Sequence, residues 1–96
     1  MACIFCQIAS GEVKSEVLYR DAKTFAIRDI RPQAPTHILV MPIEHIHSVA
    51  DLAPEQTQVV GEMVKVASLL AEREGIAQRG YRLVVNCRKE GGQAVP

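Results

Sequence analysis

The chain has 96 residues, which suits one domain, and 48% of them are hydrophobic, which favours a globular core over disorder. Eleven basic residues balance eleven acidic ones, and no Trp is present. These values argue against nucleic-acid partners and against binding to anionic membranes. There is neither a secretory signal nor a run of about 18 apolar residues that would span a membrane, and three cysteines fit a reducing compartment. We therefore expect a cytoplasmic protein.

The first half of the chain predicts short strands between turns. Residues 3–9 form a compact apolar segment, and a Ser-Gly pair follows it as turn chemistry. Residues 16–20 and 24–30 are typical of two strands joined as an antiparallel hairpin. A loop with two prolines at 31–35 precedes an apolar run at 36–41, which predicts a strand buried on both faces. Alternation in the second strand predicts two faces, with Phe25, Ile27 and Asp29 on one and Ala26, Arg28 and Ile30 on the other.

The second half predicts one long helix and one more strand. Residues 44–49 favour a short helical turn. Residues 54–74 carry apolar side chains at helical spacing, with a proline in the first turn and Gly75 just after the last. Gly61 lies inside this helix, and close packing would explain it. The alternating residues 81–86 predict a final strand.

This order of elements indicates an α+β fold, an antiparallel sheet with one long helix over one face. We expect residues 1–96 to form a single domain. The edge strands of such a sheet must be paired or protected, and self-association is one way to protect them.

The pair Cys3-x-x-Cys6 has the spacing of zinc ligands, and His45 and His47 are candidate partners. Zinc prefers four ligands, and the spacing alone supplies a pair plus scattered histidines. The alternative is that the two cysteines are small apolar residues that pack beside their neighbours.

Several polar residues stand at predicted strand ends or in loops. His37 is either a hydrogen-bonded structural histidine or a site histidine presented at the start of a strand. Asp29 and Asn86 are either turn residues or hydrogen-bonding groups, since a carboxylate can accept both hydroxyls of a ribose. The glycines at 91–92 form either a flexible turn or a loop whose backbone N–H groups approach a phosphate. No P-loop, dinucleotide fingerprint or Ser nucleophile elbow is present, so we expect no organic cofactor.

Taken in order, five stretches resemble the histidine triad family over essentially the whole sequence. They are Cys3-Ile-Phe-Cys-Gln-Ile8, Phe25 to His37, Leu39-Val-Met-Pro42 with His45-Ile46, Gly80 to Asn86, and Gly91-Gly-Gln-Ala-Val95. The branch of purine nucleoside phosphoramidases, which are dimeric nucleotide hydrolases, is the most similar. The resemblance implies a purine nucleotide as ligand and a homodimer formed through the helix at 54–74 and the strand at 81–86.

The resemblance also implies a role for particular residues. Asp29 would accept the ribose hydroxyls, and His37 would join a hydrogen-bond network around the catalytic histidines. Ala94 stands where well-known relatives have Ser, so a hydroxyl contact is absent here. A structural zinc would be held by Cys3, Cys6 and His45. The base pocket would consist of Ile4, Phe5, Ile8, Ile27 and Ile30, and the ribose and phosphate would lie beside Asn86, Gly92, Gln93 and Ala94.

The family is named for a His-x-His-x-His motif, and the three histidines at 37, 45 and 47 do not form it. The family's nucleophile, its last strand and its fourth zinc ligand are therefore expected to be missing from residues 1–96. The resemblance implies a parent enzyme that hydrolyses nucleoside phosphoramidates through a nucleotidyl-histidine, and it implies that residues 1–96 are a form truncated at the C-terminus and inactive. The alternatives are a non-catalytic nucleotide-binding or dimerisation module and a small structural zinc protein.

Overall fold

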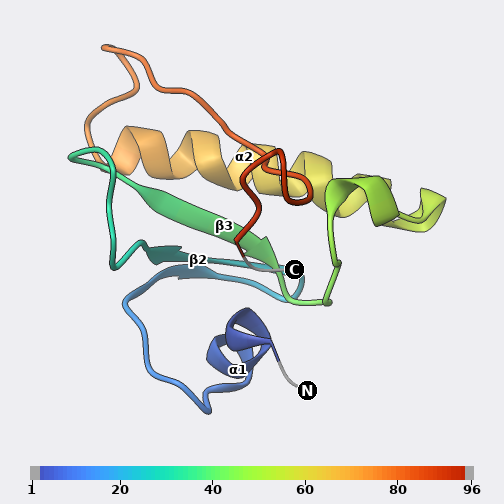
Figure 1. Ribbon diagram of the computed structural model, residues 1–96. Coiled ribbons are helices and arrows are strands. Elements are labelled where there is room, and N and C mark those ends of the chain that lie inside the picture. The colour runs from blue at the N-terminus through green and yellow to red at the C-terminus, as the bar shows by residue number, and fades with distance from the viewer. Residues whose placement is uncertain (1–2, 95–96) are drawn as a thin grey trace.

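Two helices lie on opposite faces of a three-stranded antiparallel sheet in the computed structural model, which describes residues 3–94 (Figure 1). The order of the strands in the sheet follows their order in the sequence, so β2 is central. Two short 3-10 helices precede the long helix α2. The elements are α1 (Ile4–Ser10), β1 (Val17–Arg20), β2 (Thr24–Arg28), β3 (Ile38–Pro42), η1 (Val49–Asp51), η2 (Pro54–Gln56) and α2 (Thr57–Arg73).

The predicted hairpin is confirmed, and Asp21 builds its turn. The backbone N–H groups of Lys23 and Thr24 each donate to Oδ1 of Asp21 at 2.8 Å. The hydroxyl of Tyr19 donates to the other carboxylate oxygen at 2.6 Å. These bonds hold the pKa of the Asp21 carboxyl well below its usual range, the Tyr19 hydroxyl contributing most. The ionised Asp21 carboxylate therefore stabilises the hairpin.

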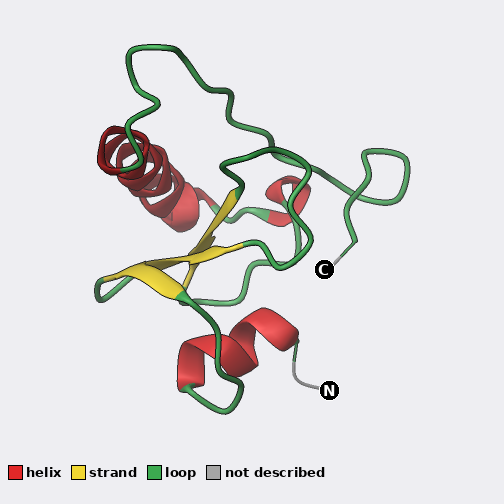
Figure 2. Cartoon of the chain, turned by 90° about the vertical axis from the view of Figure 1, so that its left-hand side faces the viewer, coloured by secondary structure: helices red, strands yellow, loops and turns green. Residues whose placement is uncertain are grey.

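The sheet buries one apolar cluster on each face, as the alternation in β2 predicts. On the α1 side, the buried Phe25, Ile27 and Met41 contact Phe5 and Ile8 of the helix. On the α2 side, the buried residues are Ala26 of β2 and Val66 and Leu70 of the helix. Because β2 contributes to both clusters, it is the most deeply buried strand. Figure 2 shows the sheet between the two helices.

The long helix is also confirmed, with its first turn wound as the 3-10 helix η2. The side chain of Gln56 accepts a hydrogen bond from the Ala53 N–H at 2.8 Å, which satisfies a backbone donor at the helix start. Gly75 adopts a left-handed φ of 75° just after the helix, which is the conformation that ends many helices. The expectation that close packing explains Gly61 is wrong, because a Cβ added at this position would meet nothing within 4 Å.

Three sequence-based expectations differ from the structure. The strand β3, which is predicted to be buried on both faces, is an edge strand in which only Met41 is buried, because within residues 3–94 it has a neighbouring strand on one side alone. Residues 44–48 are irregular, and helical structure begins at Val49. Residues 81–86 form no strand, because they find no hydrogen-bonding neighbour within residues 3–94. This segment runs on the α2 side of the sheet without joining it (Figures 1 and 2).

A bidentate ion pair fixes the end of β2 to the end of α2. The Arg28 guanidinium donates to both carboxylate oxygens of Glu74, at 2.9 and 3.1 Å, and lies 3.4 Å from Glu16. The hydrogen bonds raise the pKa of Arg28 and lower that of Glu74. This pair sets the position of the residues that follow β2.

In the described residues, no helix is long and apolar enough to cross a membrane.

Candidate functional site

The three predicted metal ligands lie together at the start of α1. The Sγ atoms of Cys3 and Cys6 are 3.2 Å apart and share a hydrogen bond, and Nδ1 of His45 is 3.2 Å from Cys6 Sγ. Cys3 also accepts a hydrogen bond from the Cys6 N–H, so it caps the helix. Between residues 3 and 94, this is the one cluster of three or more such donors, and all its ligand atoms lie within 4.8 Å of one another.

Two sulfurs and one imidazole nitrogen are a donor set that suits zinc. All three cysteines are free thiols. The hydrogen bond with Cys3, together with burial, raises the pKa of the Cys6 thiol. Residues 3–94 bring no fourth Cys, His or carboxylate to this cluster, so the three residues could hold a metal with one position left for another ligand.

Asp29 and His37 form a second group at the end of β2. Nε2 of His37 lies 3.3 Å from Oδ2 of Asp29, and the Arg31 N–H donates to Oδ1 at 2.8 Å. The other ring nitrogen of His37 accepts a hydrogen bond from the Gln33 N–H at 3.1 Å. The Asp29 side chain is 20% exposed. Each carboxylate oxygen of Asp29 keeps a lone pair for a ligand hydroxyl. The Asp29 carboxylate is therefore held in position and can still accept hydrogen bonds from a ligand.

The five residues predicted for a base pocket do not all lie together. Phe5 and Ile8 of α1 pack on the buried Ile27 under the sheet. Ile4 is 41% exposed, and Ile30 is 87% exposed in the loop after β2. The structure therefore brings three of the five into one cluster and leaves the other two on the surface.

The loop after residue 86 contains the third group of predicted residues. Asn86 Nδ2 donates to the Gly92 carbonyl at 3.4 Å. Gly91 is sterically required, because a Cβ there would lie 2.3 Å from the carbonyl oxygen of Cys87. Gln93 bridges two segments: it accepts from the Arg88 N–H and donates to the His47 carbonyl, both at 2.6 Å. Ala94 follows and is exposed.

Two cavities adjoin at His47 and Gln93. One, of about 230 Å³, lies between Phe5 of α1, Met41 of β3, Met63 of α2 and Asn86, and its wall includes the three metal-ligand candidates. The other, of about 640 Å³, is more open and is lined by His47, Asp51, Arg88, Lys89, Gly92 and Gln93.

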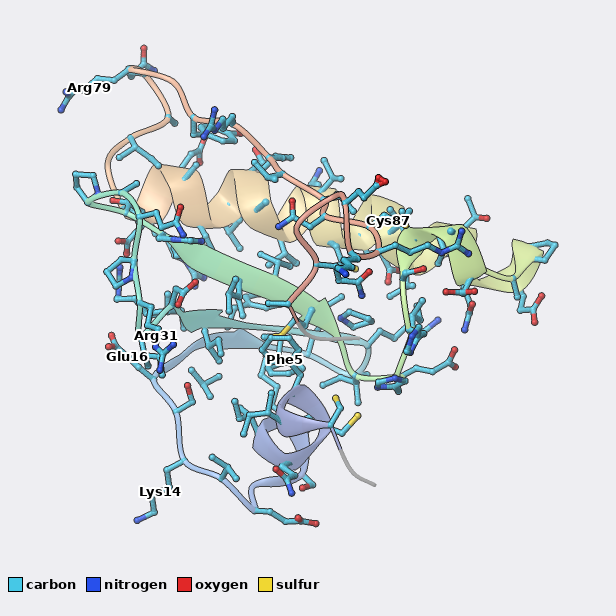
Figure 3. All side chains as sticks on the ribbon, viewed as in Figure 1. Phe5, Lys14, Glu16, Arg31, Arg79 and Cys87 are labelled. Atoms are coloured by element: carbon cyan, nitrogen blue, oxygen red, sulfur yellow. The ribbon has the colours of Figure 1, made fainter. Side chains whose placement is uncertain are left out.

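Phe5 connects the separate groups. It packs with Ile27, two residues before Asp29, and it also lines the smaller cavity with Asn86 and Gln93. Figure 3 shows Phe5 beneath the sheet, with Arg31 on one side of it and Cys87 on the other. Neither of the two cavities includes Asp29 or His37 in its wall.

Four residues of the open cavity are not identified as ligand-binding by the sequence. Asp51, Arg88 and Lys89 stand in no motif, and the spacing of His47 indicates only a candidate metal ligand. Two successive basic residues shortly before a Gly-Gly pair are the available signal. The sequence does not predict that His47 and Asp51 line the same cavity as residues 88–93, because these two segments are far apart in the chain.

Comparison with known proteins identifies relatives along nearly the whole sequence. A family model described as "Scavenger mRNA decapping enzyme C-term binding" matches residues 2–94. A purine nucleoside phosphoramidase of Escherichia coli (strain K12) is 48% identical over 92 residues, which cover 96% of this protein and 77% of the relative. Protein HitA of Neisseria gonorrhoeae is 37% identical over 93 residues, which cover 97% of this protein and 86% of HitA.

Solved structures agree with these matches. A HIT family hydrolase from Legionella pneumophila superposes with a TM-score of 0.95 at 42% identity, and the match covers 98% of this protein and 84% of that one. A histidine triad protein from Clostridium difficile also gives 0.95, at 40% identity, covering 99% of this protein and 83% of that one. The α+β arrangement described above is therefore the fold of these proteins. On these matches of sequence and structure, the protein belongs to the histidine triad family.

Proposed function

We propose that the protein binds a purine nucleotide, with the ribose held by Asp29. The E. coli relative is named as a purine nucleoside phosphoramidase and is 48% identical to this protein, which supports a ligand of that class. The apolar cluster of Phe5, Ile8 and Ile27 supports a base-binding surface beside the ribose.

The geometry of Asp29 is the observation that carries this proposal. The Arg31 N–H and the His37 ring hold its carboxylate in one orientation, at 2.8 and 3.3 Å. An ionised carboxylate held in this way accepts two vicinal hydroxyls without first having to order itself, which lowers the entropic cost of binding. If Asp29 were only a turn residue, the hydrogen bond from the Arg31 N–H would be enough, and the contact with the His37 ring would not be needed.

The family resemblance supports nucleotidyl transfer as the chemistry of the complete site. A histidine nitrogen forms a bond to the α-phosphorus, the P–N bond breaks, the amine leaves with a proton, and water then cleaves the nucleotidyl-histidine. Hydrogen-bond donors around the Gly-rich loop at 91–93 would stabilise charge on the phosphoryl oxygens. None of the histidines at 37, 45 and 47 stands in a His-x-His-x-His pattern. We propose that residues 1–96 alone bind nucleotide and do not turn it over.

Calorimetric titration with AMP and GMP tests this proposal. Asp29→Asn keeps the size of the side chain and removes its charge, so we expect affinity to fall about tenfold or more. Glu55→Gln, at an exposed position of η2 and therefore at the opposite end of α2 from the Arg28–Glu74 pair, removes one carboxylate charge and is the matched control. The absence of binding at millimolar AMP and GMP, or an equal effect of the two substitutions, would refute nucleotide binding through Asp29.

We also propose a structural zinc on Cys3, Cys6 and His45, supported by their mutual approach within 4.8 Å. Bound zinc would join α1 to the segment after β3 and stabilise the fold by mass action. Cys3→Ser should abolish the metal content measured by elemental analysis and the rise in melting temperature on adding zinc. Cys87→Ser, which removes a cysteine outside the cluster, should leave both unchanged. Equal zinc content in the two variants would contradict the assignment.

A homodimer through α2 and residues 81–86 is a further part of the proposal. Leu83, Val84 and Val85 are between 51% and 72% exposed, and Val64 of α2 is 51% exposed. Exposed apolar residues on neighbouring segments favour association. Sedimentation equilibrium should give a mass near twice 10.6 kDa. A monomer at all concentrations would exclude the dimer.

The free thiols support a reducing compartment, and we propose the cytoplasm.

A further inference from the structure

The open cavity beside Gly92 has a positive lining. Arg88 and Lys89 come from the loop after residue 86, and Asp51 is the one carboxylate in the wall. Asp51 already accepts a hydrogen bond from the hydroxyl of Ser48 at 2.5 Å. Two cations against one engaged carboxylate leave an excess of positive charge in a cavity of about 640 Å³.

The two cations of the cavity are available to a ligand. The nearest approach of Arg88 to Asp51 is 3.9 Å, and the side chains are 70% and 45% exposed, so this pair is loose. The Lys89 carbonyl accepts a hydrogen bond from the Gly92 N–H, but its side-chain ammonium makes no ion pair or hydrogen bond with the described residues. An anion that entered the cavity would therefore gain contacts without breaking a strong pair.

The loop that carries these cations is fixed in place. Arg88 adopts a left-handed φ of 60°, which is uncommon for a residue with a side chain. The Gln93 side chain accepts a hydrogen bond from the Arg88 N–H and, through its own N–H, binds the His47 carbonyl. The contacts of Gln93 join the backbone of both walls of the cavity, so the loop that carries the two basic side chains does not depend on the ligand for its placement.

We propose that this cavity receives an anionic group on the portion of the substrate beyond the α-phosphate, with Arg88 and Lys89 as the residues that determine this specificity. The inference rests on the proposed function, because it places the α-phosphate at the neighbouring loop of Gly92 and Gln93. The anion would be either the carboxylate of the departing amine or a further phosphate. Both are recognised by the same guanidinium and ammonium donors.

Equilibrium binding with matched ligands tests the inference. AMP is compared with ADP, which adds a phosphate. The methylamine phosphoramidate of AMP is compared with its glycine phosphoramidate, which adds a carboxylate. Each is measured with the unaltered protein and with Arg88→Ala/Lys89→Ala. The control is Lys14→Ala/Arg79→Ala, which removes the same charges from exposed positions away from Cys87 (Figure 3). Melting temperatures establish that all three proteins are folded.

We expect the added anion to raise affinity roughly three- to tenfold in the unaltered protein and in the control, and to give no gain in Arg88→Ala/Lys89→Ala. A gain with ADP alone identifies phosphate, and a gain with the glycine compound alone identifies carboxylate. The same gain in all three proteins, or no gain in any of them, overturns the inference.

A nucleotide-free probe separates this inference from the proposed function. Pyrophosphate should shift the NMR signals of the amides at 88–93 in the unaltered protein and not in Arg88→Ala/Lys89→Ala. If AMP does not bind and pyrophosphate still gives these shifts, the proposed function fails while the anion cavity stands. If AMP binds and neither pyrophosphate nor the added anions have an effect, the proposed function stands and the inference fails.

Discussion

Asp21 is the residue whose protonation should couple pH to stability. The Tyr19 hydroxyl and the N–H groups of Lys23 and Thr24 favour the ionised carboxylate in the folded state, so its folded pKa lies below the usual value near 3.8. The stabilisation is therefore present above that pH and is lost as the pH falls toward the folded pKa. Asp21→Asn should lower the melting temperature at neutral pH, and the difference from the unaltered protein should shrink below about pH 3.8.

Glu12→Gln is the matched control for this pH dependence. Glu12 is exposed and lies outside the hairpin turn, so its substitution should leave the melting temperature unchanged across the same range. A destabilisation by Asp21→Asn that stayed constant from neutral pH to pH 2 would show that the charge of Asp21 does not support the turn.

Part of the candidate site could be predicted from single residues and their spacing. The Cys3-x-x-Cys6 pair comes together because a helical turn separates the two sulfurs, and His45 joins them as the family resemblance implies. The contact between His37 and Asp29 was not predicted, because it depends on the path of the loop at 31–35. The bridge from Gln93 to His47 spans 46 residues and has no local signal in the sequence.

At the scale of the element, α2 contains a position where its stability can be improved. Gly61 lies in the helix, and a Cβ there would contact nothing within 4 Å. Gly61→Ala should raise the free energy of unfolding by about 0.5–1 kcal/mol, because alanine loses less backbone entropy on folding. Chemical denaturation measures this change. A loss of stability would show that another surface, such as a second copy of the protein, approaches Gly61 closely.

The elements that could be predicted are those specified by nearby residues. The hairpin follows from alternation around a turn that Asp21 builds, and α2 follows from helical spacing with Gly75 as its stop. Residues 81–86 show the limit of this reasoning. Their alternation describes two faces, but a strand also has to pair with a neighbour, and within residues 3–94 this segment pairs with none of the three strands, although the outer edge of β3 is unpaired.

At the scale of the whole molecule, β2 joins the two apolar clusters. Phe25 and Ile27 belong to the cluster under α1, whereas Ala26 belongs to the cluster under α2. We propose that residues 1–96 unfold as one unit, because loss of β2 removes the centre of both clusters. Circular dichroism and near-ultraviolet signals should therefore report a single coincident transition.

A pair of matched substitutions tests how much this core contributes to the free energy of unfolding. Ile27 is 4% exposed and Ile30 is 87% exposed, three residues apart. Ile27→Ala should cost about 2–4 kcal/mol because it leaves a cavity beside Phe5 and Met41. Ile30→Ala should change stability by no more than about 0.5 kcal/mol. Similar losses for both variants would mean that Ile30 is buried in solution, for example by a partner.

The central claim is that the groups around Asp29 and around Asn86 and Gly92 bind one nucleotide, although neither of the cavities lined by Asn86 and Gly92 includes Asp29 in its wall. A nitrogen-15 NMR titration with AMP tests this claim most directly. We predict that the amide signals near Asp29 and those from Asn86 to Gln93 shift together along one saturation curve. Shifts confined to one group, or no shifts at millimolar AMP, would contradict the claim.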